Sequence, residues 1–299
     1  MIPPTFDYIA PQTLSEAVAL LGQNEHAKIL AGGQSLIPMM RFRLASPAVL
    51  VDINRIDGLS YISEENGWLK IGAMTRESTI DQSPIVHEKY PLLADTARVI
   101  ADPLVRNMAT VGGNLAHADP ANDHPATMIA YGARVIATGP GGERVIPIEE
   151  FFVSLFESSL ASNEILTEIR IPASQPRSGS PRSGSPRSGG AYLKLERKVG
   201  DFATVAVAVQ VQLDAAGNIA SAGIGLTNVG LTPIKAVAAE NYLRGKAPSS
   251  DNIRHAAQLA ADAAEPNPDY RGSEDYKRSL VKTYTIRALR KAVERAKGG

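Results

Sequence analysis

Two glycine doublets are the features of this chain whose residue types and spacing could do chemistry. The first lies in Ala31-Gly32-Gly33-Gln34-Ser35 and the second in Thr110-Val111-Gly112-Gly113-Asn114. Adjacent glycines allow left-handed backbone angles, which can point successive N–H groups into one concavity that suits a phosphate. A following helix adds a favourable dipole, and Ser35, Thr110 and Asn114 can donate further hydrogen bonds. Either doublet alone is more often a tight turn, but the pair favours a dinucleotide whose diphosphate needs two cradles.

Other nucleotide and catalytic motifs are missing from the sequence. Neither Gly-x-Gly-x-x-Gly nor Gly-x-x-x-x-Gly-Lys-Ser/Thr occurs, so a Rossmann fold and a P-loop are not indicated. The glycines from Gly139 to Gly142 fit a hairpin turn better than a phosphate loop. Ser35 has no partnered His and Asp at a recognisable spacing, which argues against a hydrolase nucleophile.

The composition excludes several classes of protein. The 299 residues are 44% hydrophobic and 21% charged, which is typical of a globular chain with two or three compact units. Lys+Arg and Asp+Glu number 31 each, so no net field attracts nucleic acid or an anionic membrane. The absence of cysteine rules out disulfides and cysteine-ligated clusters within the chain. With neither a signal peptide nor roughly 20 consecutive apolar residues, we expect a cytoplasmic protein without a membrane span.

The first doublet lies in an expected β-loop-α-β unit, for which we set the bounds 1–57. The expected elements are a helix over Leu14 to Leu21 with Thr13 as N-cap, a strand over Lys28 to Leu30, a helix over Leu36 to Leu44 and a strand over Val49 to Ile53.

The second doublet lies in an expected unit of residues 58–175. The expected elements are a hairpin around Trp68 to Ile71, helices over Pro91 to Ile100 and Pro125 to Tyr131, a loop-rich stretch from Asp102 to Asp123, a hairpin of Arg134 to Thr138 with Glu143 to Pro147, and a strand over Ile165 to Ile171.

The third expected unit, residues 176–299, is a small sheet covered by helices. Residues 176–185 contain Pro-Arg-Ser-Gly-Ser twice, and residues 186–190 are Pro-Arg-Ser-Gly-Gly. This repeat cannot bury apolar area, so we expect a mobile surface loop rather than an RNA or phosphate contact. Alternation of Val with Ala and Gln predicts a strand from Val205 that pairs with Ile219 to Asn228. The expected helices are Pro233 to Leu243, Asp251 to Ala264 and Ser273 to Ala296.

Further segments accompany the two glycine loops in a specific order. They are Asp102 to Asn107, Ala118 to Asp123, Glu164 to Leu166, Ile169 to Pro172, Tyr192 to Asp201 and Gly225 to Asn228. With these segments the chain resembles, over essentially its whole length, the FAD-binding medium subunit of carbon monoxide dehydrogenase and the xanthine dehydrogenase-type molybdenum hydroxylases. The resemblance implies an α+β fold with two subdomains that grip FAD, of the vanillyl-alcohol-oxidase/PCMH type. A C-terminal α+β domain with a small antiparallel sheet and helices would follow.

The resemblance also implies partners. A small subunit would carry two [2Fe–2S] clusters, a large subunit would carry molybdopterin and oxidise the substrate, and the assembly would be a dimer of heterotrimers. This chain would bind FAD non-covalently and pass electrons from the clusters to an external acceptor. Its lack of cysteine agrees with that role and disfavours the hydroxybenzoyl-CoA reductase branch, whose flavin subunit holds an extra cluster. The alternatives are a stand-alone FAD-dependent oxidase or reductase, for which no acid/base residue is evident, and a cofactor-free assembly protein.

Site residues follow from the resemblance residue by residue, and all of them would bind the cofactor rather than act as catalytic groups. The diphosphate would be held by Leu30, Ala31, Gly32, Gly33, Gln34, Ser35, Leu36 and Ile37 together with Thr110, Gly112, Gly113 and Asn114. The flavin and its hydroxyls would be contacted by Ile100, Ala101, Asp123, Leu166, Tyr192 and Lys194. The family often has His at the position of Gln34. His117, Asp119, Asp123 and His124 are clustered, but we expect no metal because this loop serves the cofactor.

Overall fold

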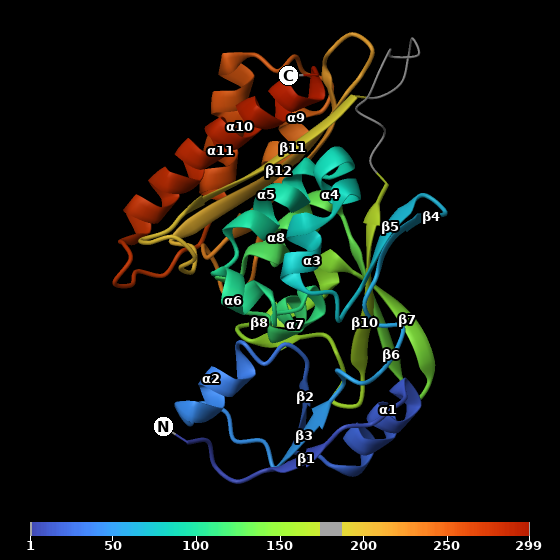
Figure 1. The fold of residues 1–299 in the computed structure, drawn as a ribbon. Coiled ribbons are helices and arrows are strands. Elements are labelled where there is room, and N and C mark those ends of the chain that lie inside the picture. Colours follow the sequence, from blue (N-terminus) through green and yellow to red (C-terminus); the bar gives the residue numbers. More distant parts are fainter. Residues whose placement is uncertain (1, 174–186, 299) are drawn as a thin grey trace.

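The computed structural model describes residues 2–173 and 187–298. Figure 1 shows an N-terminal part, a middle part and a C-terminal part, with the N-terminal and C-terminal parts at opposite ends of the molecule. Each part has its own sheet, and both helices and strands occur in all three. The expected α+β fold class is confirmed.

A parallel three-stranded sheet of order β1-β3-β2 forms the N-terminal part. Its elements are β1 (Asp7–Ile9), α1 (Leu14–Gln23), β2 (Ala27–Leu30), α2 (Leu36–Arg41) and β3 (Val49–Asp52). Helix α1 begins with a capping box, in which Thr13 accepts from the Glu16 amide and Glu16 accepts from the Thr13 amide. The expected N-cap is therefore correct. Ala17, Val18 and Leu21 form the buried face of this helix.

The middle part is built on an antiparallel sheet of order β4-β5-β10-β6-β7. Its strands are β4 (Ile62–Glu65), β5 (Trp68–Gly72), β6 (Arg134–Gly139), β7 (Gly142–Pro147) and β10 (Ile165–Pro172), and a hairpin of β8 (Phe152–Ser154) and β9 (Glu157–Ser158) follows the 3₁₀ helix η1 (Ile148–Glu150). Its helices are α3 (Glu77–Gln82), α4 (Pro84–Lys89), α5 (Pro91–Val99), α6 (Pro103–Arg106), α7 (Val111–His117) and α8 (Asp123–Tyr131).

Two short helices replace part of the loop-rich stretch expected before Asp123. Helix α6 starts with Pro103 at its first position, and Asp102 caps it by accepting from the Val105 amide at 2.9 Å. Helix α7 is capped by Thr110. The expectation of irregular structure was wrong here because local caps stabilise helices too short for a visible apolar period.

The C-terminal part has an antiparallel sheet of order β11-β12-β13-β14, with α10 and α11 on one face (Figure 1). Its elements are β11 (Arg187–Leu195), β12 (Val205–Leu213), β13 (Ile219–Thr227), β14 (Ile234–Lys235), α9 (Val237–Leu243), α10 (Ser250–Asp262) and α11 (Glu274–Ala296). The helix expected from Pro233 begins only at Val237, because Ile234 and Lys235 pair with β13.

The other face of this sheet is buried against α5 and α8 of the middle part. Gly223 and Gly225 of β13 allow the contact, since a Cβ would lie 1.9 Å from Ala130 O and 2.0 Å from Ala126 O, respectively. Both faces of β12 are therefore buried at its start, with valines in the C-terminal core and Ala206 in the core of the middle part.

Residues 187–190 are strand rather than the loop we expected, because they begin β11 and pair with β12. Gly189 lies so close to α11 that a Cβ would be 2.2 Å from Ala292 O. The glycines that suggested a loop are thus the residues that let a helix pack on the strand. The rest of the repeat expectation, residues 176–186, lies outside the described residues. Among the helices that the structure describes, none combines the length and apolarity that a membrane crossing requires.

Candidate functional site

The first glycine loop joins β2 to α2 and presents unpaired backbone amides. Gly33 has φ +72°, a left-handed conformation that favours glycine. A Cβ at Gly32 would lie 2.4 Å from Met108 O, so only glycine lets this loop approach the segment before α7. Within residues 2–173 and 187–298, the amides of Gly32, Gly33, Gln34 and Ser35 donate no backbone hydrogen bond. These groups can receive a phosphate.

The second glycine loop differs from what we expected, because its amides are already paired. The Gly112 amide donates to Ala73 O at 2.9 Å, and the Gly113 amide donates to the Thr110 hydroxyl at 3.2 Å. The Val111 and Asn114 amides also have backbone acceptors. The expectation that this loop offers successive free N–H groups was therefore wrong. The polar group that it does leave over is Asn114 Oδ1, which is buried without a partner among the described residues.

The two glycine loops lie side by side although they are far apart in the sequence. A Cβ at Gly113 would lie 3.6 Å from the Ala31 Cβ, and Gly32 faces the backbone of Met108 and Ala109. The hydrogen bond from Gly112 to Ala73 continues to β10, because the Ala73 amide donates to Thr167 O at 2.9 Å. Leu166 precedes this residue at a β-bulge, so the structure links it to the second loop.

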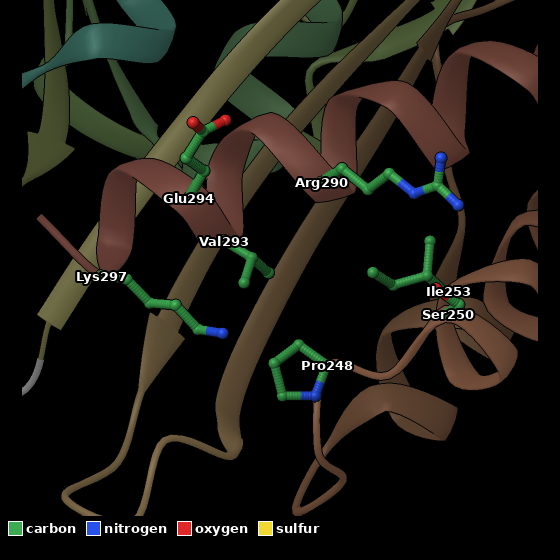
Figure 2. Close-up of a pocket in the computed structure, with 7 residues that line it drawn as sticks. All are labelled: Pro248, Ser250, Ile253, Arg290, Val293, Glu294 and Lys297. Carbon is green, nitrogen blue, oxygen red and sulfur yellow. The ribbon is translucent and has the colours of Figure 1, made fainter. Parts of the chain in front are cut away.

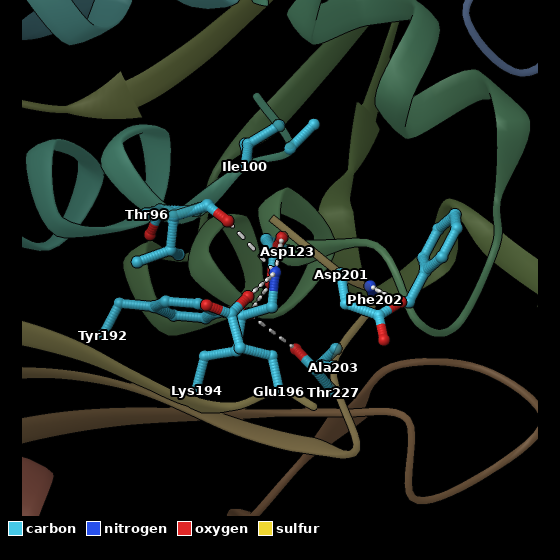
Figure 3. Close-up of polar contacts among 12 residues, drawn as sticks. Thr96, Ile100, Asp123, Tyr192, Lys194, Glu196, Asp201, Phe202, Ala203 and Thr227 are labelled. Carbon is cyan, nitrogen blue, oxygen red and sulfur yellow. Dashed lines mark hydrogen bonds and ion pairs between the residues drawn. The ribbon is translucent and has the colours of Figure 1, made fainter. Parts of the chain in front are cut away.

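A buried cluster of Asp123, Tyr192 and Lys194 forms the second half of the candidate site (Figure 3). Asp123 Oδ1 accepts from the Tyr192 hydroxyl at 2.6 Å, and Oδ2 accepts from Lys194 Nζ at 2.9 Å. Lys194 also donates to Val99 O at 3.1 Å, next to Ile100. Figure 3 shows Ile100 on the same side of the cluster as Thr96, with Asp201 and Phe202 on another side.

Burial controls the electrostatics of this cluster. It raises the pKa of the Asp123 carboxyl, while the Lys194 ammonium and the Tyr192 hydroxyl oppose this by stabilising the charged form. Burial and the neighbouring Asp123 raise the pKa of Tyr192 well above its usual value, so its hydroxyl stays protonated and donates. The Tyr192 side chain is part of the buried core of the middle part, with 3% exposure.

Ile100 and Ala101 form a strained corner beside this cluster. Ala101 has φ +46°, which is unusual for a residue with a Cβ. Arg106 stabilises the corner by donating to Ile100 O at 3.0 Å and to Ala101 O at 3.2 Å. Gly200 packs against it, since a Cβ there would lie 2.7 Å from Ala101 O. The corner therefore meets the loop that follows β11.

The predicted residues thus fall into two groups. One group surrounds the two glycine loops, and Leu30, Leu36 and Ile37 belong to it through β2 and α2. The other contains Asp123, Tyr192, Lys194, Ile100 and Ala101, and β11 lies far from β2 and α2 in Figure 1. Asp123 begins α8, and Asn122 beside it donates to Asn114 O at 2.9 Å, which connects the two groups.

The histidines and aspartates around the start of α8 do not converge on one another. His124 Nε2 pairs with Glu77 Oε2 at 2.7 Å in a fully buried contact, and the His117 ring lies 5.2 Å from the Phe156 ring. The described residues contain no group of three or more His, Cys, Asp or Glu side chains that could hold a metal.

The C-terminal part has a groove of about 390 Å³ between α10 and α11 (Figure 2). The residues that line it are Pro248, Ser250, Ile253, Arg290, Val293, Glu294 and Lys297. None of them is a predicted site residue, so the groove is separate from the candidate site.

Two polar residues at the glycine loops escaped the sequence analysis. Arg76 and Asn54 hydrogen-bond each other at 2.6 Å, and Asn54 also donates to Ala31 O at 2.8 Å. Neither belongs to a motif, so only the folded contacts reveal them.

Comparison with known proteins gives matches over nearly the whole chain. Residues 4–174 match the family model of the FAD-binding domain in molybdopterin dehydrogenase, and residues 190–292 match the C-terminal domain of the CO dehydrogenase flavoprotein. The carbon monoxide dehydrogenase medium chain of Hydrogenophaga pseudoflava is 44% identical over 293 residues, which cover 98% of each chain. Subunit alpha of the 6-hydroxypseudooxynicotine dehydrogenase complex from Paenarthrobacter nicotinovorans is 38% identical, with 99% of this chain and 97% of that one covered.

Solved structures give the same result. A chain of carbon monoxide dehydrogenase from Hydrogenophaga pseudoflava, in a form that lacks the Mo-pyranopterin moiety of the molybdenum cofactor, superposes with a TM-score of 0.92 at 46% identity. A chain of quinoline 2-oxidoreductase from Pseudomonas putida 86 superposes with a TM-score of 0.89 at 32% identity. Each alignment covers 99% of both chains.

Proposed function

Because the chain belongs to the family of FAD-binding medium subunits of carbon monoxide dehydrogenase and xanthine dehydrogenase-type molybdenum hydroxylases, we propose that it is the electron-transfer subunit of such an enzyme. In this role it accepts electrons from the [2Fe–2S] clusters of a small partner subunit and passes them to an external acceptor. A large molybdopterin subunit oxidises the substrate. The assembly is a dimer of heterotrimers in the cytoplasm.

The observation that carries the proposal is the side-by-side position of the two glycine loops in a chain of this family. The free amides from Gly32 to Ser35 and the left-handed angle of Gly33 suit a phosphate. The unpartnered Asn114 Oδ1 suits a hydroxyl donor. These features support FAD as the resident cofactor, which supplies redox chemistry that the side chains lack.

The chain's own residues bind and orient in this proposal. The first loop holds the diphosphate through its amides. In the second loop, Gly113 presents no side chain toward Ala31 of the first loop, while Asn114 and Thr110 contribute polar groups. Leu30, Leu36 and Ile37 pack around this cradle.

The flavin end is assigned to the second group of residues. Asp123 keeps lone pairs beyond those that Tyr192 and Lys194 occupy, so it can still accept from a cofactor hydroxyl. Leu166 and the Ile100–Ala101 corner contact the ring system, and Lys194 adds a buried positive charge. These residues bind and orient the flavin and take no part in proton transfer.

Gly113→Asp tests the cofactor placement. The new side chain would start 2.8 Å from the Thr110 hydroxyl and 3.6 Å from Ala31 Cβ, and would direct a carboxylate into the space between the loops. We expect the purified variant to lose its flavin absorbance, because an anion repels a diphosphate.

Gly141→Asp is the matched control, since a Cβ at this turn between β6 and β7 has no neighbour within 4 Å. It should keep full FAD content. Wild-type FAD affinity in Gly113→Asp would overturn the placement of the diphosphate. The electron route is tested separately, by reducing the purified enzyme complex with its substrate and following flavin bleaching.

A further inference from the structure

Arg76 is joined to both glycine loops, although it belongs to neither. Its backbone forms an antiparallel bridge with Thr110, at the start of the second loop. Its guanidinium donates through Nη1 to Met108 O and through Nη2 to Asn54 Oδ1 at 2.6 Å. The backbone of Arg76 therefore contacts the second glycine loop at Thr110, and its side chain contacts Met108 and Asn54 where the two loops meet.

Asn54 carries this connection to the first loop. Its Nδ2 donates to Ala31 O at 2.8 Å, while its Oδ1 accepts from Arg76. Asp52 holds the amide in place by accepting from the backbone and the side chain of Asn54, and the Tyr8 hydroxyl in turn donates to Asp52. The network thus runs from β1 through the end of β3 to Arg76.

The two loops pack closely at the Met108 carbonyl, which accepts from Arg76. Gly32 approaches Met108 O so closely that a Cβ would lie 2.4 Å away. The planar guanidinium fixes this carbonyl and the Asn54 amide at set positions, because its donors point in fixed directions. A lysine ammonium in the same place could not hold both acceptors with that geometry.

From these contacts we infer that Arg76 is a positioning residue, which together with Asn54 sets the spacing of the two glycine loops and thereby the affinity for a nucleoside diphosphate. The inference rests on the proposed function, because the spacing matters only for a ligand that contacts both loops. The free amides of the first loop can hold a single phosphate by themselves, whereas a diphosphate that also reaches the Thr110 and Asn114 side chains depends on the separation of the two loops.

Arg76→Lys tests this inference, since it keeps the positive charge and removes the two guanidinium N–H groups that donate to Met108 and Asn54. FAD affinity of the cofactor-depleted full chain would be measured by titration, and ADP and AMP would be measured as competitors. We expect FAD and ADP to bind on the order of tenfold more weakly, the loss typical of a charge-assisted hydrogen bond. AMP affinity should stay unchanged, so the ADP-to-AMP ratio falls. Arg254→Lys, an exposed change on α10, should alter none of these values.

Asn54→Ala is a second variant that leaves Arg76 in place. It should reproduce the loss for FAD and ADP, and the double variant should bind no worse than the weaker single one, because both changes break one network. Equal weakening of ADP and AMP would indicate general destabilisation and overturn the inference, as would unchanged FAD affinity in both single variants. A wild-type chain that binds no FAD would overturn the proposed function itself.

Discussion

At the scale of single residues, Lys194 and Asp123 form a buried ion pair in the candidate site. The two side chains are 2% and 8% exposed and lie 2.9 Å apart. Each charge has lost its hydration and depends on the other, with the Tyr192 hydroxyl as an additional donor to the carboxylate. Such a pair adds little net stability, but loss of one partner leaves a buried charge uncompensated.

We therefore expect Lys194→Met to lower the free energy of unfolding by about 3 kcal/mol. Burial already raises the pKa of Asp123, and removal of the ammonium should raise it further. A raised carboxyl pKa gives stability at low pH that is lost as the pH rises, so the deficit should shrink in mild acid. Chemical denaturation of wild type and variant at several pH values measures both effects.

Lys70→Met provides the comparison, because Glu65, the partner of Lys70, is 59% exposed and stays hydrated when the ammonium is removed. It should cost much less stability than Lys194→Met. If both variants lose the same stability, or if the Lys194→Met deficit does not vary with pH, then Asp123 and Lys194 are not coupled as described.

Residue types explain which site residues could be predicted from the sequence. Gly32 could be singled out as part of a glycine doublet, and the structure gives a reason for glycine there, since a Cβ would lie 2.4 Å from the backbone oxygen of Met108. Arg76 and Asn54 were not, since an isolated arginine and an isolated asparagine have many surface roles and gain this one only when β3 meets the second loop. The pairing of the amides at Gly112 was also invisible, because its acceptor Ala73 lies in a distant segment.

At the scale of elements, α7 is too short to be stable by itself, and the Thr110 N-cap stabilises it. Its seven residues include both glycines of the second doublet, which are poor helix formers. The Thr110 hydroxyl accepts from the Gly113 amide at 3.2 Å, and the Thr110 backbone bridges to Arg76. The same hydroxyl therefore caps the helix and keeps the second loop in shape.

Thr110→Ala should lower the free energy of unfolding by about 1 kcal/mol and should also weaken FAD binding several-fold, because the loop loses its capped geometry. Ser273→Ala removes the equivalent cap of α11, where Ser273 accepts from the Tyr276 amide at 3.3 Å. That change should cost similar stability with no effect on FAD. Thermal unfolding and FAD titration of both variants distinguish the two roles, and equal FAD affinities would show that the α7 cap serves stability alone.

The elements that could be predicted are those with a local signal that survives in the fold. Helix α1 has a capping box and one apolar face, and β12 has a clear alternation. The start of β11 has no such signal, because its glycines become strand only through pairing with β12 and through packing, of Gly189 under α11 and of Gly190 against Leu92 of α5. Helix α3 was missed because its six residues are too few for a period to show.

At the scale of the whole molecule, the C-terminal sheet shares a core with the middle part. Tyr192, Ala206 and Ala208 belong to the same buried cluster as Leu93 and Ala126. The residues of β11 that we propose bind the cofactor are therefore positioned by the contact between these two parts. The interactions that stabilise this contact also hold Tyr192 against Asp123.

Asp95 of α5 is the polar centre of this contact. Arg295 of α11 donates two hydrogen bonds to it, at 2.7 and 3.0 Å, and Lys291 donates a third at 3.0 Å. The Tyr192 amide lies 3.3 Å from the same carboxylate. Burial alone would raise the pKa of Asp95, but the two cations outweigh it and hold the pKa below its usual value.

A lowered carboxyl pKa predicts how the contact depends on pH. The carboxylate of Asp95 contributes its full stabilisation above the unfolded pKa of about 4, and this contribution is lost as the pH falls toward the lower folded value. Asp95→Asn should therefore cost about 2 kcal/mol at pH 7, less than for a fully buried pair because Lys291 is 39% exposed. The deficit should narrow below about pH 4.

Denaturant unfolding of wild type and Asp95→Asn between pH 7 and pH 3 measures this deficit. Asp251→Asn is the control, because Asp251 is 89% exposed and its pair with Arg254 should contribute within about 0.5 kcal/mol. Tyr192 lies on β11 and shifts with it. Asp95→Asn should therefore also weaken FAD retention at pH 7. A deficit of constant size across the whole pH range would mean that shape complementarity, and not the carboxylate of Asp95, holds the C-terminal sheet on the middle part.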